Sequence, residues 1–327
     1  MKKTNTEPNK QDFADFLSHH IFKEDILSFY QFKRGASSFN YLVELKSKKV
    51  LVKLAWKYDK QGVERLAKII SALSNKHELP VAKLLTYNNQ TLFQYQNSYG
   101  FVLEYIDGVS LKATDITSVH IKQIFNAYKQ IEPAAQKHKT LLMPALDLKK
   151  IQKSYLGNIK EIETLFKRKK LSLLLLSKLK NELINIGHSP LQILTEKQSI
   201  IHGDFHHNNL LFKDNKLAAI LDLEDLGYGY KTEDLLRFLL CQIARFPLLY
   251  PKKKTINAYL NLITKEFSYS HDEWMVGLNS FTLQKMKKLF SNPKNLKKNA
   301  LKKMIQLIVF MRLYHYIEQQ LKQILTH

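Results

Sequence analysis

The sequence is poor in cysteine, in acidic residues and in long apolar runs. Cys241 is the one cysteine among 327 residues, so an intrachain disulfide framework and a zinc site built from several cysteines are excluded. No run approaches the roughly 18 apolar residues that a membrane-spanning helix needs. The basic start with Lys2 and Lys3 is not followed by the apolar core of a secretion signal. We therefore expect a cytoplasmic protein with no transmembrane segment.

Acidic residues are few relative to basic ones: 29 Asp and Glu stand against 51 Lys and Arg, a formal net charge of +22. Such a charge attracts anionic partners, which include nucleotides, nucleic acids and anionic lipids. Basic residues concentrate at 149–180 and 285–303. No nucleic-acid-binding motif is readable, and aromatic residues do not alternate with the basic runs. We expect no nucleic-acid partner, and the two basic clusters are either partner-binding surfaces or solvated helix faces.

Apolar residues make up 45% of the chain, which is enough for a packed core, and the length suits two domains or two lobes. Two β-rich runs at 41–45 and 50–54 predict a hairpin, and residues 61–74 have the apolar spacing of an amphipathic helix. Two more strands are expected within 91–106, and an N-terminal helix over 13–30. The first lobe is therefore predicted to be rich in strands.

The remainder of the sequence is mainly helical in its apolar spacing. Residues 199–223 interrupt this pattern with a short apolar segment, a polar loop and two strands, Leu210–Phe212 and Ala218–Leu223. A turn near residue 107 predicts the boundary between domains 1–106 and 107–327. The expected helices cover roughly residues 117–137, 148–186, 232–246, 254–267 and 297–325.

The polar loop has the residue types needed for phosphate and metal chemistry. A hairpin return of the two strands would bring Asp222 close to Asn209. Carboxylate and amide oxygens suit Mg²⁺, which also takes phosphate oxygens. Asp204 would then be free to orient or deprotonate an attacking hydroxyl. His206 and His207 have no evident third ligand, so a zinc site is not expected here.

The segment from His202-Gly203-Asp204 to Asn209, with Asp222 eighteen residues after Asp204, resembles the catalytic segment of the aminoglycoside phosphotransferase and choline kinase superfamily. These small-molecule phosphotransferases are relatives of protein kinases. The resemblance implies an α+β, bilobal, protein-kinase-like fold with a small antiparallel-sheet N-lobe and a larger, mainly helical C-lobe. It also implies that Asp234 supports the catalytic loop.

The N-terminal part is similar to the same superfamily. Val50-Leu51-Val52-Lys53 resembles the kinase strand whose lysine reaches the nucleotide phosphates, and Glu64 on the following helix is placed to hold Lys53. Residues 35–38 lie where a phosphate-covering loop is expected, and residues 104–106 resemble the hinge that meets adenine. The residues that the resemblance implies for nucleotide binding are Lys53, Glu64, Gly35, Ser37, Ser38, Glu104, Tyr105 and Ile106.

The predicted function is ATP- and Mg²⁺-dependent transfer of the γ-phosphoryl group to a hydroxyl of a small molecule. Asp204 and Asn209 are the expected catalytic residues, and Asn209 and Asp222 the expected metal ligands. The basic clusters favour a neutral or anionic acceptor, such as a sugar or an envelope precursor, over an aminoglycoside, and an amino alcohol stays open. The alternatives are a kinase that phosphorylates proteins, a nucleotide-binding pseudokinase, and a basic protein that binds nucleic acid or a membrane surface. The choice of ATP or GTP and the oligomeric state are left open.

Overall fold

A computed structural model describes residues 7–32, 35, 37–74, 79–112, 115–144, 181, 198–243, 253–290 and 293–326. The described residues divide into two compact units. The first takes its residues from Met1–Leu142 and Asn208–Asp225, and the second from Met143–His207 and Leu226–His327. The predicted boundary between residues 106 and 107 stays a prediction.

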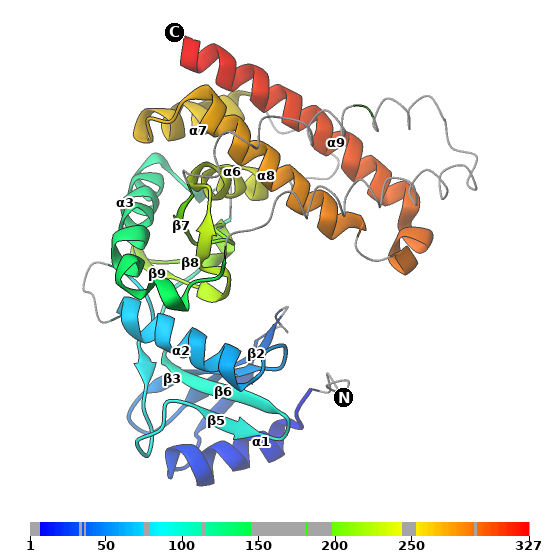
Figure 1. Cartoon of the computed structure of the whole chain (residues 1–327). Helices are drawn as coiled ribbons and strands as arrows, with labels where there is room; N and C mark the ends of the chain where they lie inside the picture. The colour runs from blue at the N-terminus through cyan, green and yellow to red at the C-terminus, as the bar shows by residue number, and fades with distance from the viewer. Residues whose placement is uncertain are drawn as a thin grey trace. The chain divides into compact units, whose positions relative to one another are not determined.

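An antiparallel six-stranded sheet forms the centre of the first unit. The strands are β1 (Ser28–Gln31), β2 (Ser38–Glu44), β3 (Lys49–Ala55), β4 (Leu84–Leu85), β5 (Phe93–Tyr95) and β6 (Ser98–Glu104). Their order is β1-β2-β3-β6-β4, and β5 also pairs with β6. Helices α1 (Lys10–Phe16) and α2 (Lys60–Ser74) lie on opposite faces of this sheet (Figure 1).

The face under α1 is an aromatic core. Phe13 of α1 is fully buried and contacts Tyr41 of β2 and Tyr95 of β5, with ring centroids 5.0 and 4.6 Å apart. Val50 and Val52 of β3 are buried in the same cluster. Because side chains alternate across a strand, Lys53 lies on the other face of β3. This alternation directs a lysine away from the apolar core.

The rest of the first unit is helix α3 (Ser118–Ala135), a 3₁₀ turn at Gln136–Leu141, and a second hairpin, β8 (Leu210–Lys213) and β9 (Lys216–Ile220). The hairpin is fastened at both ends. Ile220 donates its backbone N–H to Pro80 O at 2.6 Å, and Gln123 of α3 accepts the backbone N–H of Leu217 at 2.7 Å. A 3₁₀ turn, Leu223–Asp225, follows β9.

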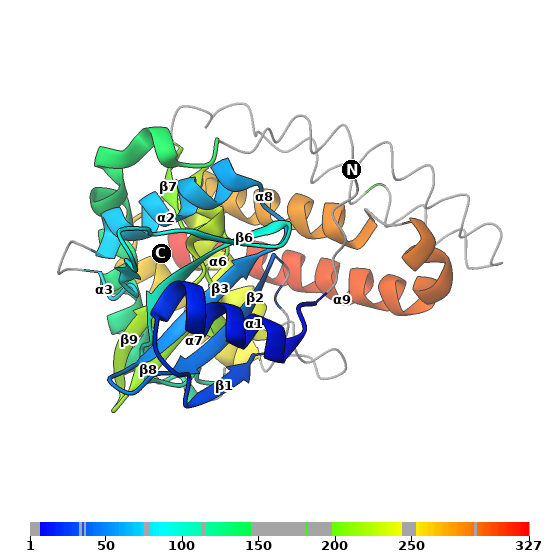
Figure 2. The same cartoon turned by 90° about the horizontal axis from the view of Figure 1, so that it is seen from below.

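The second unit is mainly helical. It contains the short pair β7 (Ser199–Ile201) and β10 (Gly227–Gly229), and helices α6 (Lys231–Ile243), α7 (Lys253–Glu266), α8 (His271–Phe290) and α9 (Pro293–Thr326). Helix α8 packs against α6 and runs beside α9, as Figure 2 shows. Tyr314 of α9 donates to Asn279 of α8 at 2.6 Å, and both side chains are buried. Buried polar pairs therefore contribute to the packing of these helices.

The predicted fold class is confirmed: an antiparallel sheet forms the N-terminal part and helices the C-terminal part. The helix predicted at 61–74 and both predicted hairpins are present. The helix predicted over 13–30 is wrong beyond Phe22, because Lys23 takes a left-handed backbone conformation with φ 56° and residues 28–31 pair with β2. The sequence reading missed α8, and the helix predicted over 148–186 lies almost wholly outside the described residues. None of the described helices combines the length and apolar character that a membrane span requires.

Candidate active site

The β8–β9 hairpin brings Asn209 and the residue before Asp222 together, as the sequence predicted. Asn209 precedes β8 and Leu221 follows β9, and the N–H of Leu221 donates to Asn209 O at 2.8 Å. Asp222 then takes a left-handed conformation with φ 61°. Aspartate tolerates this region better than most residues, and such outliers concentrate at functional sites. Asp222 therefore follows directly after the last hydrogen bond at the open end of the hairpin.

Lys53 of β3 lies between two carboxylates. Its Nζ is 3.3 Å from Asp222 Oδ1, and it forms a closer ion pair with Glu224. The side chains of Lys53 and Glu224 are 12% and 7% exposed, whereas that of Asp222 is 42% exposed. The Lys53 ammonium therefore contacts one buried carboxylate, Glu224, and one solvent-accessible carboxylate, Asp222.

The charges in this group reinforce one another. Burial lowers the pKa of Lys53, but the negative charges of Asp222 and Glu224 outweigh burial and raise that pKa above its usual value. Burial likewise favours the neutral form of Glu224, but the charge and hydrogen bond of Lys53 keep the pKa of Glu224 below its usual value. The lysine is therefore charged and Glu224 is ionised at neutral pH.

Two hydroxyl groups and an arginine fix Glu224. Ser37 donates to the Glu224 carboxylate, and Tyr58 Oη donates to Oε2 of the same group at 3.1 Å. Arg65 of α2 donates to the backbone carbonyls of Leu141 and Glu224, at 3.0 and 3.1 Å. We call Lys53, Ser37, Tyr58, Asp222 and Glu224 the Lys53 cluster.

The expected partner of Lys53 requires a correction. Glu64 on α2 was predicted to hold Lys53, but in the structure Glu64 pairs with Lys60, 3.8 Å away, on the outer side of the helix. The apolar face of α2, which includes Val63, Leu66 and Ile70, turns Glu64 toward solvent. Glu224, and not Glu64, forms the ion pair with Lys53 in the structure. The sequence contained a signal for it, an acid two residues after the predicted metal ligand.

The remaining predicted nucleotide contacts lie at the ends of strands. Gly35 closes a turn by donating its N–H to Ser38 O at 3.2 Å, and Ser38 is buried at the start of β2. Glu104 ends β6, and its N–H donates to Lys83 O at 2.8 Å. Tyr105 and Ile106 follow outside the sheet, where their backbone groups are not part of a strand ladder. Their roles toward adenine and phosphate stay predictions.

The catalytic-loop motif belongs to the second unit and is supported by Asp234. The carboxylate of Asp234 accepts the backbone N–H of His202 at 2.7 Å and of Gly203 at 3.2 Å. Gly203 has φ 84°, a conformation that disfavours any residue with a Cβ. Burial raises the pKa of Asp234 to about 7, against the opposing effect of Arg237. The predicted support of the loop by Asp234 is confirmed.

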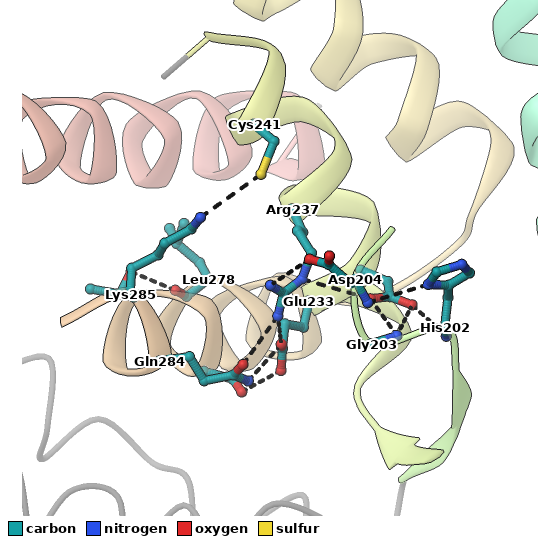
Figure 3. A network of polar contacts seen from close by, with 12 residues as sticks. His202, Gly203, Asp204, Glu233, Arg237, Cys241, Leu278, Gln284 and Lys285 are labelled. Atoms are coloured by element: carbon teal, nitrogen blue, oxygen red, sulfur yellow. Dashed lines mark hydrogen bonds and ion pairs between the residues drawn. The ribbon is translucent and has the colours of Figure 1, made fainter. Parts of the chain in front are cut away.

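Asp204 carries a positive or hydrogen-bonding partner on each carboxylate oxygen. Arg237 Nη1 is 3.7 Å from Oδ1, a pair drawn in Figure 3. His206 Nε2 is 3.3 Å from Oδ2. Burial would raise the pKa of Asp204, but the hydrogen bond and charge of His206 and the charge of Arg237 lower that pKa to about 2. Asp204 is therefore a carboxylate at neutral pH. Such a group orients a hydroxyl and takes up its proton only as the hydroxyl becomes acidic during reaction.

The residues at the end of the hairpin fit a magnesium ion by their chemistry. Asn209 and Asp222 offer an amide and a carboxylate oxygen, and Glu224 adds a second carboxylate beside Lys53. Mg²⁺ commonly takes one or two carboxylates, and substrate phosphates and waters complete its shell. Within the described part of the chain, no group of three or more His, Cys, Asp or Glu side chains is arranged to hold a metal ion without such help.

Comparison with known proteins places these observations in a family. The model of the phosphotransferase enzyme family matches residues 28–253, which is more than half of the chain. A search of curated protein sequences found no match.

Solved structures share the fold at low sequence identity. Spectinomycin phosphotransferase APH(9)-Ia, in complex with ADP and spectinomycin, is 15% identical with a TM-score of 0.64, covering 96% of this chain and 100% of that chain. An aminoglycoside phosphotransferase from Alicyclobacillus acidocaldarius is 12% identical with a TM-score of 0.63, covering 98% and 99%. A thermostable mutant of APH(4)-Ia with AMP-PNP and hygromycin B is 11% identical with a TM-score of 0.56, covering 91% and 97%. Because the family model spans both the Lys53 cluster and the Asp204 loop, the chain belongs to the phosphotransferase enzyme family.

Proposed function

We propose that this chain transfers the γ-phosphoryl group of ATP to a hydroxyl of a small molecule, with Mg²⁺ as cofactor. The observation that carries the proposal is the Lys53 cluster, in which a buried lysine meets the carboxylate that follows the β8–β9 hairpin. Family membership supports it, and so do the relatives that bind ADP or AMP-PNP together with spectinomycin or hygromycin B.

Each group has a task in this proposal. Lys53 binds the α- and β-phosphates, Glu224 orients Lys53, and Asn209 and Asp222 hold the metal. When bound, Mg²⁺ neutralises charge on the β- and γ-phosphate oxygens. The chemistry consists mainly of positioning and charge stabilisation, for which fixed charged groups are sufficient.

Asp204 acts on the acceptor. Its carboxylate accepts a hydrogen bond from the acceptor hydroxyl and turns the oxygen lone pair toward phosphorus. As the new O–P bond forms and the bond to ADP breaks, the hydroxyl proton passes to Asp204. A pKa of about 2 makes this group a weak base before transfer begins, so in this proposal its main contribution is orientation.

The acceptor is proposed to be neutral or anionic, on the basis of the basic clusters at 149–180 and 285–303. Polycationic antibiotics would be repelled by such concentrations of positive charge. Sugars, envelope precursors and phosphorylated metabolites fit this description, and an amino alcohol is a candidate that the same experiment covers.

The test is an ADP-release screen of the full chain with Mg²⁺ and ATP against sugars, amino alcohols, anionic metabolites and aminoglycosides. We expect turnover with a small hydroxyl compound, a loss of about 100- to 10,000-fold in Asp204→Asn, and full activity in Asp214→Asn. Asp214 is a matched control, because it lies exposed in the turn between β8 and β9.

Three outcomes would overturn the proposal. The first is ADP release that persists unchanged in Asp204→Asn. The second is nucleotide binding without turnover on any compound of the panel. The third is transfer of labelled phosphate only to proteins of a lysate from which small molecules have been removed.

A further inference from the structure

The contact between α6 and α8 in the second unit is polar where helix packing is usually apolar. Glu233 and Asp234 of α6 are 1% and 0% exposed, and Ser280 and Thr282 of α8 are equally buried. Buried acids are tolerated only when they are paired or hydrogen-bonded. The side chains that hydrogen-bond or pair with Glu233 therefore show which groups this interface holds in a fixed position.

A glycine allows α8 to reach these acids. A Cβ on Gly277 would lie 2.4 Å from Thr232 Oγ1 and 2.6 Å from the Glu233 backbone nitrogen, so the two helices touch directly at this point. Ser280 and Gln284 lie three and seven residues further on, on the same face of α8. Ser280 Oγ donates to Glu233 Oε2 at 2.5 Å, and Gln284 Nε2 donates to Glu233 Oε1 at 2.6 Å.

Arg237 completes this arrangement. Its Nη2 donates to Glu233 Oε1 at 2.7 Å and to Gln284 Oε1 at 3.1 Å, and its guanidinium lies over the Phe281 ring at 5.3 Å. These contacts fix the plane of the guanidinium. We call Arg237, Asp204, Glu233, Asp234, Ser280 and Gln284 the Arg237 network (Figure 3).

With its plane fixed, the guanidinium directs its other nitrogens to the catalytic loop. Nη1 lies 3.7 Å from Asp204 Oδ1 and Nε 3.9 Å from Asp234 Oδ1. Asp234 in turn holds the backbone of His202 and Gly203. One buried side chain therefore contacts both the side chain of Asp204 and the acid that supports its loop.

We propose that Arg237 is a positioning residue for phosphoryl transfer, held by Glu233 and Gln284 so that it fixes the Asp204 carboxylate toward the acceptor hydroxyl. This inference rests on the proposed function of Asp204. Its consequence is that α8, which lies beyond the residues matched by the family model, contributes to the chemical step.

The experiment uses two variants in the full chain. Arg237→Met alone would leave Glu233 buried without its cation and would threaten folding. The double variant Arg237→Met with Glu233→Gln removes both charges together, and Gln284→Met removes one support while leaving Arg237 in place. Lys285→Met is the matched control, because Lys285 follows Gln284 on α8 and contacts Cys241 and the Phe281 ring instead.

Because small displacements of reacting groups cost up to about 100-fold, we expect kcat to fall about 100-fold in the double variant and about 10-fold in Gln284→Met. The KM for ATP should change less than about twofold, and Lys285→Met should match the wild type. Arg237→Lys should recover part of the lost kcat, because it keeps the charge but not the planar fork.

A second readout does not depend on turnover. The ¹³C carboxyl signal of Asp204 in the nucleotide-free chain, assigned by its loss in Asp204→Asn, should titrate at higher pH in the double variant than in the wild type. His202 and His206 also face this group and are retained. If no acceptor supports turnover but this titration moves, the proposed function fails, and only the contact by which Arg237 acts on the Asp204 carboxylate is upheld.

The role of Arg237 is overturned if the double variant keeps the wild-type kcat and the wild-type Asp204 titration. It is equally overturned if the variants lower only the thermal midpoint of unfolding, because Arg237 would then serve stability alone.

Discussion

The Lys53 cluster and the Arg237 network use the same ingredients to different ends. Each surrounds one basic side chain with two or three carboxylates, and in each the acids outnumber the base. In the Lys53 cluster the second acid, Asp222, is 42% exposed. In the Arg237 network Glu233 and Asp234 are buried, and helix-borne groups satisfy Glu233.

This difference in the exposure of the acids suits the Lys53 cluster to binding a ligand and the Arg237 network to supporting a loop. Negative charge in excess at an accessible position attracts a cation and costs little while solvent can screen it. Negative charge in the interior must be matched in place, because a buried unpaired charge is expensive. The first cluster is therefore suited to change its partners when ligands arrive, and the second to keep them.

Within the Lys53 cluster, the largest effect is expected at the lysine itself. Lys53→Met should lower kcat/KM for ATP about 10- to 100-fold, since a charge-assisted contact is worth about 1.5–3 kcal/mol. It should also cost about 3–5 kcal/mol of stability, because Glu224 stays buried without its cation. Lys49→Met, on the same face of β3 but half exposed, is the control. Steady-state kinetics and urea unfolding measure both quantities, and equal effects at the two lysines would contradict the prediction.

A second substitution sharpens the assignment of the acid that holds Lys53. Glu224→Gln should lower kcat/KM for ATP about 10-fold, because one charged partner of Lys53 is lost. Glu64→Gln should change it less than twofold, since Glu64 forms an exposed helical pair worth about 0.3–0.5 kcal/mol. The reverse order of effects, measured under the same conditions, would restore Glu64 to the role first expected of it.

Glu64 and Glu224 show which part of the site could not be predicted from the sequence. The alternation of β2 and β3 and the apolar spacing of α2 could be read directly, and so could the hairpin that brings Asn209 and Leu221 together. The choice between Glu64 and Glu224 could not, because it depends on how α2 rotates against the sheet. Helix α8 was missed for a related reason: its buried Ser280 and Thr282 blur the apolar pattern that marks a helix.

The length of the N-terminal helix was predicted wrongly because its apolar spacing extends too far. Its apolar spacing continues past residue 22, but the chain there turns through Lys23 and enters β1. Pairing with β2 satisfies a whole strand of backbone groups, which local helical spacing cannot outweigh.

A smaller effect on stability tests the rigidity of the second unit. Gly203→Ala should destabilise the protein by about 1–2 kcal/mol, because alanine is strained at φ 84°. Asn215→Gly, at φ 59° in an exposed turn of the first unit, should change stability by less than about 0.5 kcal/mol. Chemical denaturation of both variants checks the pair. If Gly203→Ala is harmless, the loop is not held in the conformation described.

The smallest effect concerns the pH dependence of kcat, in which we expect no change that is due to Asp204. With a pKa of about 2 for Asp204, kcat at saturating nucleotide should show no acid limb from this residue between pH 5 and 8. The folded-state pKa lies below the unfolded value of about 3.9, so the stability that Asp204 contributes is present above that value and is lost as the pH falls toward 2. An acid limb above pH 5 that survives in His206→Gln would contradict this expectation.

The placement of Glu224 after the hairpin has a consequence for control. In protein kinases an ion pair between the strand lysine and a helix glutamate is what movement of that helix makes or breaks. Here an outward swing of α2 would leave both carboxylates beside Lys53, and would break the hydrogen bonds of Arg65 to the main chain at Leu141 and Glu224. An inhibitor that works by displacing a regulatory helix is therefore the wrong design for this protein, and compounds aimed at residues 222–224 are the better choice.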